Sequence, residues 1–207
     1  MKKNTKLFYD DALIYNNACE LLLNEQGVKL ADDQLFVPII YLLRHSLELS
    51  LKAHLFKYLE ENSIVCDFCD FVLYDESGNK LQKDKLLNTH SIKKLFECMI
   101  FFDKQRLVPL FNASEIKVLK KGLQHIMRLD DKSDYFRYPL GKRLNKHKRN
   151  FVKEYDITND FCVPELKTKC NLLVSKDNKK MYVTNHLDLL ITPQRLKQCV
   201  ELLLSRL

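Results

Sequence analysis

Apolar residues recur at the three- and four-residue spacing of a helix along most of the chain. Five stretches show this pattern and are predicted as helices: residues 9–26, 35–61, 89–102, 114–129 and 196–207. The stretch 35–61 has the widest apolar stripe, which indicates a central helix packed by several others. Thr89 or Asn88 is expected to cap the third helix, and Thr192 followed by Pro193 is expected to begin the last one.

Two regions between the predicted helices favour strands instead. Residues 71–74 are β-prone and precede a turn sequence, Glu-Ser-Gly-Asn, so the segment 62–87 is expected to form an inserted loop or hairpin. Residues 170–174 and 181–184 flank a polar turn and form a second hairpin candidate, within a basic loop and hairpin region at 140–190. The predicted fold is therefore mainly α, a bundle of four to five helices with one or two short β-hairpins.

Composition agrees with one helical globular domain, residues 1–207, inside the cell. The apolar fraction is 46%, and the chain has only 4 Gly and 5 Pro, which is typical of a helical core. The seven cysteines are scattered, no signal peptide is evident, and the longest apolar run, residues 35–43, is too short to cross a bilayer. We therefore expect a cytoplasmic protein with reduced thiols and no membrane contact. The net charge of +7 suggests an anionic partner.

A single arginine stands out at the predicted end of the fourth helix. Arg137 lies between Phe136 and Tyr138, and Pro139 follows directly. A helix does not easily run through proline, so Arg137 is expected at a helix-to-loop junction, where its guanidinium can contact aromatic rings and face a phosphate or carboxylate. Ser133, one turn earlier, is expected to orient the arginine or to cap the segment.

Three charged residues repeat within the predicted central helix. Arg44, Glu48 and Lys52 are four residues apart and therefore share one face. They form either a polar wall that faces Arg137 across the bundle or an exposed face stabilised by ion pairs. The first interpretation is preferred, because the charges interrupt a strongly apolar helix. The alternative role for Arg137 is structural: an ion pair with Glu48 or with an aspartate that fixes the end of the helix.

The densest basic stretch follows Arg137. It contains Lys142, Arg143, Lys146, His147, Lys148, Arg149 and Lys153. Such a run either neutralises phosphates of a nucleic acid or forms a solvated loop. Aromatic residues on both sides of it, Tyr135 and Phe151 among them, favour nucleic acid to some extent.

A Cys-x-x-Cys pair, Cys66 and Cys69, is the only metal-like spacing in the sequence. A closed zinc site needs four ligands, and no second pair of matching spacing accompanies this one. Packing within a loop explains the pair as well as metal binding does. We therefore predict no metal and no cofactor.

Three segments in order resemble the HEPN superfamily. Residues 41–53 are similar to the long second helix of that superfamily, with its H-x-x-E-x-x-x-K-A character. Residues 89–95, Thr-His-Ser-Ile-Lys-Lys-Leu, are similar to the G-H-x-L-x-x-L start of the next helix, and residues 136–139 match its Arg-Tyr-Pro. The resemblance implies a helical bundle that often dimerises. It also implies a family of mostly metal-independent ribonucleases in toxin–antitoxin, abortive-infection and CRISPR-linked defence.

The catalytic signature implied by the resemblance is an arginine followed, after four to six residues, by a histidine at a dimer cleft. Here the expected histidine positions after Arg137 hold Lys142, Arg143 and Leu144, and His147 is the nearest histidine beyond them. The spacing from Arg143 to His147 is one residue short of the signature. The chain therefore departs from the family pattern at its most specific point.

The leading hypothesis is a HEPN-like protein that binds RNA and is a candidate for cleaving it without metal, in a defence or toxin–antitoxin setting. Arg137 would stabilise charge on the phosphate, Arg143 would assist, and His147 or His90 would move protons. The binding residues expected beside them are Arg44, Glu48, Lys52, His90, Ser133, Tyr138, Lys146, Lys148 and Arg149. The partners expected are RNA, a second copy of the chain, and a partner protein or antitoxin.

Two other functions stay open. One is a catalytically inactive HEPN-like dimerisation or interaction module, which the missing histidine favours. The other is a sensor of a small ligand or nucleotide that uses the same polar residues. The geometry around Arg137 discriminates between the enzyme and the interaction module.

Overall fold

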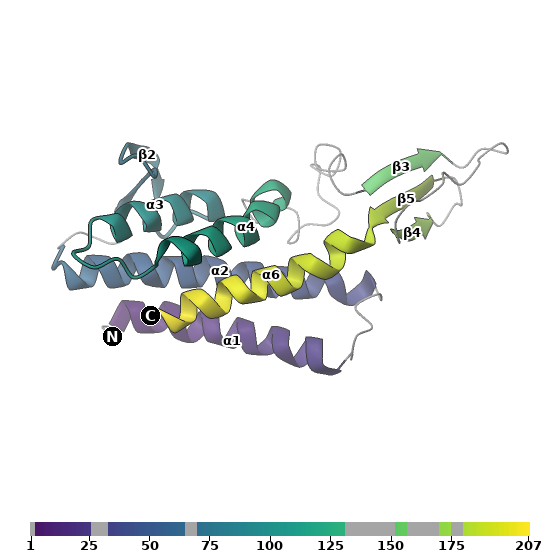
Figure 1. Cartoon of the computed structure of the whole chain (residues 1–207), viewed down its shortest axis with the longest axis horizontal. Helices are drawn as coiled ribbons and strands as arrows, with labels where there is room; N and C mark the ends of the chain where they lie inside the picture. Colours follow the sequence, from purple (N-terminus) through teal and green to yellow (C-terminus); the bar gives the residue numbers. More distant parts are fainter. Residues whose placement is uncertain (1–2, 26–32, 65–69, 131–151, 157–169, 175–179) are drawn as a thin grey trace.

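The computed structural model of the chain describes residues 3–25, 33–64, 70–130, 152–156, 170–174 and 180–207 (Figure 1). The helices in these stretches are α1 (Lys3–Glu25), α2 (Asp33–Glu61), α3 (Ile92–Lys104), α4 (Ala113–Asp130) and α6 (His186–Ser205). The strands are β1 (Val72–Tyr74), β2 (Lys80–Lys85), β3 (Val152–Asp156), β4 (Cys170–Val174) and β5 (Lys180–Asn185). The prediction of a mainly α fold with short β-hairpins is confirmed.

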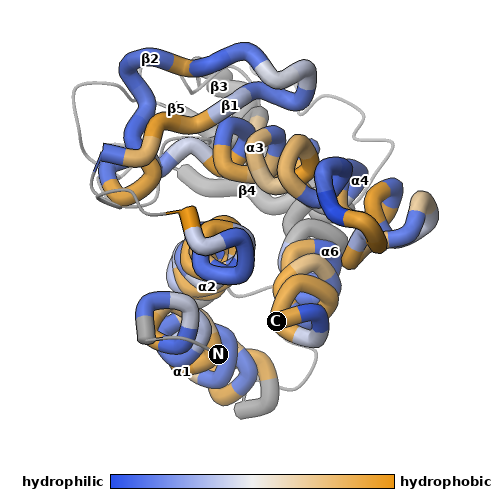
Figure 2. The backbone as a smooth tube through the Cα atoms, turned by 90° about the vertical axis from the view of Figure 1, so that its left-hand side faces the viewer, coloured by the Kyte–Doolittle hydropathy of each residue, from blue (hydrophilic) through white to orange (hydrophobic). Residues whose placement is uncertain are grey.

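Helix α2 is the centre of the bundle, as its wide apolar stripe predicts. It packs against α1, α3 and α6, and Figure 2 shows it between α1 and α3 with α6 beside it. Its side chains that are at most 1% exposed include Ile39, Ile40, Leu43, Leu47, Leu51, Leu55, Phe56 and Leu59. Burying one such side chain contributes about 2 kcal/mol, so this helix supplies a large part of the core.

Helix α1 begins six residues earlier than the apolar pattern predicts. Its first turn, Lys-Asn-Thr-Lys, is polar, so hydrophobic spacing gives no signal there. The buried Thr5 hydroxyl donates to Glu60 Oε2 at 2.7 Å, near the far end of α2. This hydrogen bond joins the first turn of α1 to the end of α2, between residues 55 positions apart in sequence.

The predicted start signals of two helices are wrong. The N-cap of α3 is Ser91, whose Oγ accepts from Lys94 N at 3.2 Å, and Thr89 instead donates to Lys85 O at 2.7 Å. Helix α6 begins at His186, so Pro193 lies inside it rather than at its start. A proline inside a helix removes one backbone hydrogen bond, and the helix can still continue past it. Proline is well tolerated at the first position of a helix, but a proline does not have to mark a helix start.

The hairpin predicted between α2 and α3 is confirmed. Strands β1 and β2 pair antiparallel, with Tyr74 opposite Lys80. Gly78 takes a positive φ of 88° in the turn, a conformation that favours glycine. The Tyr74 ring stacks on Phe101 of α3 with centroids 5.4 Å apart, so the hairpin is packed against the bundle.

The second predicted hairpin is also present, and it is part of a larger sheet. Strands β4 and β5 pair antiparallel, with Leu172 opposite Val183. Strand β3 pairs with the other edge of β5, giving the order β3-β5-β4. The sequence of β3, Val-Lys-Glu-Tyr-Asp, falls at the end of a charged stretch and its pattern does not predict a strand. Figure 1 shows this sheet beyond the N-terminal end of α6.

Candidate functional site

The charged residues of α2 lie in the interior of the bundle. Arg44 is 0% exposed, Glu48 1% and Lys52 4%, so the interpretation as an exposed charged face is wrong. Their four-residue spacing places the two cations on either side of the carboxylate. Together with His90 these residues form what is called here the charge cluster.

Glu48 accepts hydrogen bonds from every other member of the charge cluster. Its Oε2 accepts from Arg44 Nη1 at 3.0 Å, and its Oε1 accepts from Lys52 Nζ at 3.0 Å and contacts His90 Nδ1 at 2.9 Å. Burial alone would raise the pKa of the carboxyl group, but the charges of Lys52 and Arg44 and the hydrogen bonds outweigh it and lower the pKa to about 2. Glu48 is therefore ionised at neutral pH.

The two cations also hold the segment between β2 and α3. Arg44 Nη2 donates to the carbonyl of His90 at 2.5 Å, and Lys52 Nζ donates to the carbonyl of Leu87 at 3.1 Å. Carbonyl groups of an irregular segment need such partners when they are buried. The charge cluster thus joins the central helix to the residues that precede α3.

His90 connects the charge cluster to the surface. Its side chain is 43% exposed, whereas that of Glu48 is 2% exposed. Because ionised Glu48 can only accept, Nδ1 of His90 carries the proton in this contact, and Nε2 of the neutral ring has the free lone pair. A buried carboxylate that orients an accessible imidazole is an arrangement suited to proton transfer.

The other predicted site residues lie outside the described residues. They are Ser133, Arg137, Tyr138, Arg143, Lys146, His147, Lys148 and Arg149. The polar wall facing Arg137 and the pairing of Arg137 with Glu48 therefore stay predictions. Cys66 and Cys69 also lie outside the described residues, so the prediction that they hold no metal is not tested. Of the predicted set, Arg44, Glu48, Lys52 and His90 come together in one place.

Sequence reasoning did not single out His54, which is 3% exposed inside the bundle. Its Nε2 contacts the carbonyl of Leu203 at 2.9 Å, and its Nδ1 has no hydrogen-bond partner. Burial lowers the pKa of the ring to about 4, with the nearby Lys57 and Arg106 acting in the same direction and the Leu203 contact against it. The signal that could have revealed it is a histidine within the apolar stripe of the central helix.

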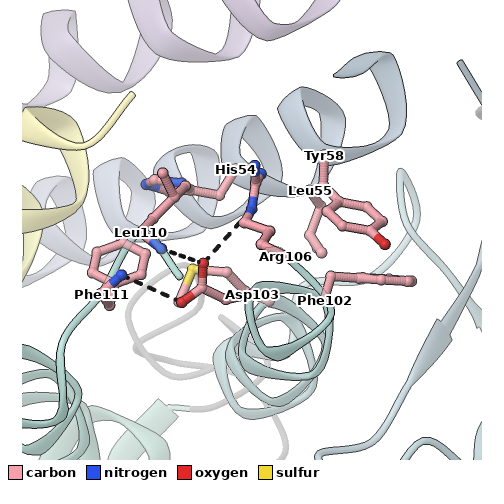
Figure 3. A pocket seen from close by; sticks show the side chains of 9 residues that line it. His54, Leu55, Tyr58, Phe102, Asp103, Arg106, Leu110 and Phe111 are labelled. Carbon is pink, nitrogen blue, oxygen red and sulfur yellow. Dashed lines mark hydrogen bonds and ion pairs between the residues drawn. The ribbon is translucent and has the colours of Figure 1, made fainter. Parts of the chain in front are cut away.

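A small cavity of about 10 Å³ adjoins His54 (Figure 3). On its other side the buried Asp103 accepts from the backbone amides of Leu110 at 2.8 Å and Phe111 at 3.3 Å. Arg106 Nε lies 3.6 Å from the same carboxylate. A cavity of this volume has room for at most one water molecule, so this site is too small for a substrate.

Thiol and metal chemistry have little support in the described part of the chain. Cys19, Cys98 and Cys199 are buried free thiols, and desolvation raises their pKa values to about 11, 12 and 12. Such thiols are protonated at neutral pH and are poor nucleophiles. Among the described residues, no three His, Cys, Asp or Glu side chains are grouped so as to hold a metal ion.

No helix in the described stretches combines the length and the apolar character needed to cross a bilayer. Comparisons of the chain with protein-family models, with curated proteins and with solved structures found no match.

Proposed function

We propose that this protein binds RNA and cleaves it without metal, in a defence or toxin–antitoxin setting, and that His90 is a proton-transfer group of the reaction. The observation that supports this proposal is the 2.9 Å contact between Nδ1 of the half-exposed His90 and the buried, ionised Glu48. The resemblance of the chain to HEPN ribonucleases supplies the substrate class.

Metal-free RNA cleavage uses the 2′-hydroxyl group of the substrate as the nucleophile. Nε2 of His90 would take the 2′-hydroxyl proton while the oxygen attacks the adjacent phosphorus, and the bond to the 5′ oxygen then breaks. The buried carboxylate of Glu48 holds the ring in place through Nδ1, so that Nε2 is the nitrogen left to take the proton. Arg137 is proposed to stabilise the negative charge on the phosphate, and His147 to protonate the leaving 5′ oxygen, with Arg143 beside it. The products are a 2′,3′-cyclic phosphate and a 5′-hydroxyl end.

RNA binding is proposed to depend mainly on phosphate contacts. The chain has a net charge of +7, and its densest basic run includes Lys146, Lys148 and Arg149. Because such binding releases counterions, the affinity should fall steeply as the salt concentration rises.

The test uses the purified protein, end-labelled mixed-sequence RNA and EDTA at low salt. Wild-type protein should produce cyclic-phosphate ends, and a substrate with a 2′-deoxy nucleotide at the cleaved position should resist. His90→Ala should lower the cleavage rate by about 100-fold or more, since a general base contributes about 10²–10⁴-fold. Its RNA affinity should stay within about threefold of wild type, because contacts between basic side chains and RNA phosphates supply most of the binding energy.

Controls distinguish chemistry from folding. Lys83→Ala removes an exposed cation of β2 and should leave cleavage unchanged. His90→Ala must also retain the wild-type circular dichroism spectrum. Intact RNA after incubation with wild-type protein would reject the catalytic part of the proposal, and the lack of a mobility shift at low salt would reject RNA binding.

The second candidate is a catalytically inactive interaction module, and the charge cluster itself favours it. Both cations of α2 already bind Glu48 and backbone carbonyls of the same chain. In that case Arg44 and Lys52 hold α2 to the segment before α3 and serve stability alone. This candidate predicts that RNA stays intact and that His90→Ala alters only the melting temperature.

A further inference from the structure

A groove of about 350 Å³ is lined by residues of α3, of α4 and of the turn in the β1–β2 hairpin. Figures 1 and 2 show α3 and α4 side by side, with the hairpin beside α3. Pockets that bind small molecules have volumes of about 300–1,000 Å³, and this groove has room for about ten water molecules at about 30 Å³ each. It is therefore large enough for a small organic molecule, unlike the cavity beside His54.

The groove has an apolar floor between polar side chains. Phe96 of α3 is 3% exposed, and Met127 of α4 is packed against the core. Lys93 and Glu97 lie three residues before and one residue after Phe96, so all three share one face of α3. Methionine adapts to ligands of different shape, and the methylene stems of lysines extend an apolar surface of this kind.

Ion pairs hold both carboxylates of the lining. Glu76 in the hairpin turn accepts from Lys120 Nζ of α4 at 3.1 Å and from Lys104 Nζ at the end of α3 at 3.3 Å. This carboxylate therefore joins the hairpin to both helices. Lys93 Nζ lies 3.8 Å from Glu97 Oε1, one turn further along α3. The acidic side chains of the groove are thus already neutralised by lysines.

Lys121 is the cation of the lining that no carboxylate neutralises. It is exposed on α4, and no hydrogen bond or ion pair joins it to any other residue that the structure describes. Because the lining holds three lysines and two glutamates, it attracts one negative charge. Gln124, one turn after Lys121, adds an amide group that can donate hydrogen bonds to an anion.

We propose that this groove binds a small organic acid, with its apolar body on Phe96 and Met127 and its carboxylate held by Lys121 and Gln124. An inorganic anion would leave the apolar floor in contact with water, and a neutral apolar molecule would leave Lys121 without an anion. An RNA base fits less well, because stacking needs an exposed aromatic face and Phe96 is almost completely buried. The proposal goes beyond the RNA chemistry and does not depend on it.

The test uses 3-phenylpropionate, which combines one carboxylate with an apolar ring of suitable size. In amide NMR spectra of the isotope-labelled full chain, it should shift resonances of residues 93–97 in α3 and 120–127 in α4. For a ligand of this size we expect a dissociation constant on the order of 1 mM. The alcohol 3-phenylpropanol keeps the body without the charge, and acetate keeps the charge without the body. Each should bind at least about fivefold more weakly.

Charge reversal on α4 tests the cation. Lys121→Glu removes the attraction and adds a repulsion, so it should weaken binding of 3-phenylpropionate by about tenfold. The matched control is Lys117→Glu, which makes the same charge change at an exposed position of the same helix outside the groove. It should leave the dissociation constant within about twofold of wild type.

The site is overturned if about 10 mM 3-phenylpropionate shifts no resonance of these two segments, or if 3-phenylpropanol binds as tightly as the acid. Equal weakening by Lys117→Glu and Lys121→Glu would also overturn it, since binding would then follow the net charge alone. If Lys121→Glu lacks the wild-type circular dichroism spectrum, Lys121→Gln serves in its place and must weaken binding.

A short RNA added to the complex tests the other occupant. It should leave the shifts caused by 3-phenylpropionate unchanged. Displacement of the acid by RNA would assign the groove to the RNA surface and overturn the proposal. RNA cleavage by the same samples is scored separately, so failure of the ligand site is distinguishable from failure of the proposed function.

Discussion

Replacing Glu48 by glutamine tests whether the carboxylate holds the charge cluster together. Glutamine keeps the size of the side chain and removes its charge, which leaves the cations of Arg44 and Lys52 buried without their shared anion. The pKa of Glu48 falls from 4.5 to about 2, and at 1.36 kcal/mol for each unit of pKa the surroundings favour the ionised group by about 3 kcal/mol. Loss of one member of a buried ion pair costs about 3–5 kcal/mol, which agrees with this figure.

The assay is urea unfolding followed by circular dichroism at neutral pH. We expect Glu48→Gln to lower the free energy of unfolding by about 3 kcal/mol, which corresponds to a fall in Tm of about 10 °C for a chain of this size. The matched control is Glu201→Gln. Glu201 pairs with Lys197 at 3.5 Å with the same four-residue spacing, but its side chain is 51% exposed, so the loss should be at most about 0.5 kcal/mol.

A triple variant shows whether the cost of Glu48→Gln comes from the attraction that is lost or from the cations that are left without a partner. Arg44→Met, Glu48→Leu and Lys52→Met together replace the ions of α2 by apolar side chains. They should cost less than the sum of the three single substitutions, because no charge is left buried without a partner, although the carbonyls of His90 and Leu87 lose their donors. A loss of stability for Glu48→Gln no larger than for Glu201→Gln would show that the charge cluster does not depend on the carboxylate charge. A triple variant that loses as much stability as the three single variants added together would show that the three ions do not act as a unit.

Three further predictions concern the stability of the bundle. His54 has a pKa of about 4 in the folded chain against an ordinary 6.5, so the unfolded chain binds the proton first. The free energy of unfolding should therefore fall by up to about 3 kcal/mol as the pH drops from 6.5 to 4, and His54→Gln should flatten this decline in urea titrations at each pH. Gly122→Ala should destabilise the protein by about 1–3 kcal/mol in thermal melts, because the Cβ of alanine would collide with Cys199 Sγ of α6. The higher helix propensity of alanine is smaller than this cost. A variant as stable as wild type would show that α4 and α6 can move apart. Asn112 Oδ1 accepts from Glu115 N at 2.9 Å and Glu115 Oε2 accepts from Asn112 N at 2.9 Å, so Asn112→Ala should cost about 1 kcal/mol in chemical unfolding, and Asn112→Ser should restore most of it.

The chemistry of the candidate site was only partly predictable. The four-residue spacing of Arg44, Glu48 and Lys52 identified a shared face of one helix, because that relation depends on local geometry alone. Their burial was not readable from the spacing, since an exposed and an internal ion ladder have the same sequence pattern. The contact of His90 with Glu48 joins residues 42 positions apart, and only the packing of α3 on α2 brings them together.

By itself, the sequence determined the main helices, both hairpins and the central place of α2, because hydrophobic periodicity and turn residues act over a few neighbouring positions. The tertiary structure decided the first turn of α1 and the strand β3, whose partners, Glu60 and β5, are distant in sequence. The cap of α3 at Ser91 and the start of α6 at His186 also differ from the sequence prediction. It also decided that the ions of α2 are internal while Leu7, Ile14 and Leu21 are exposed. Burial depends on which helices pack together, and a helix face looks the same in the sequence whether it meets a neighbour, solvent or a second chain.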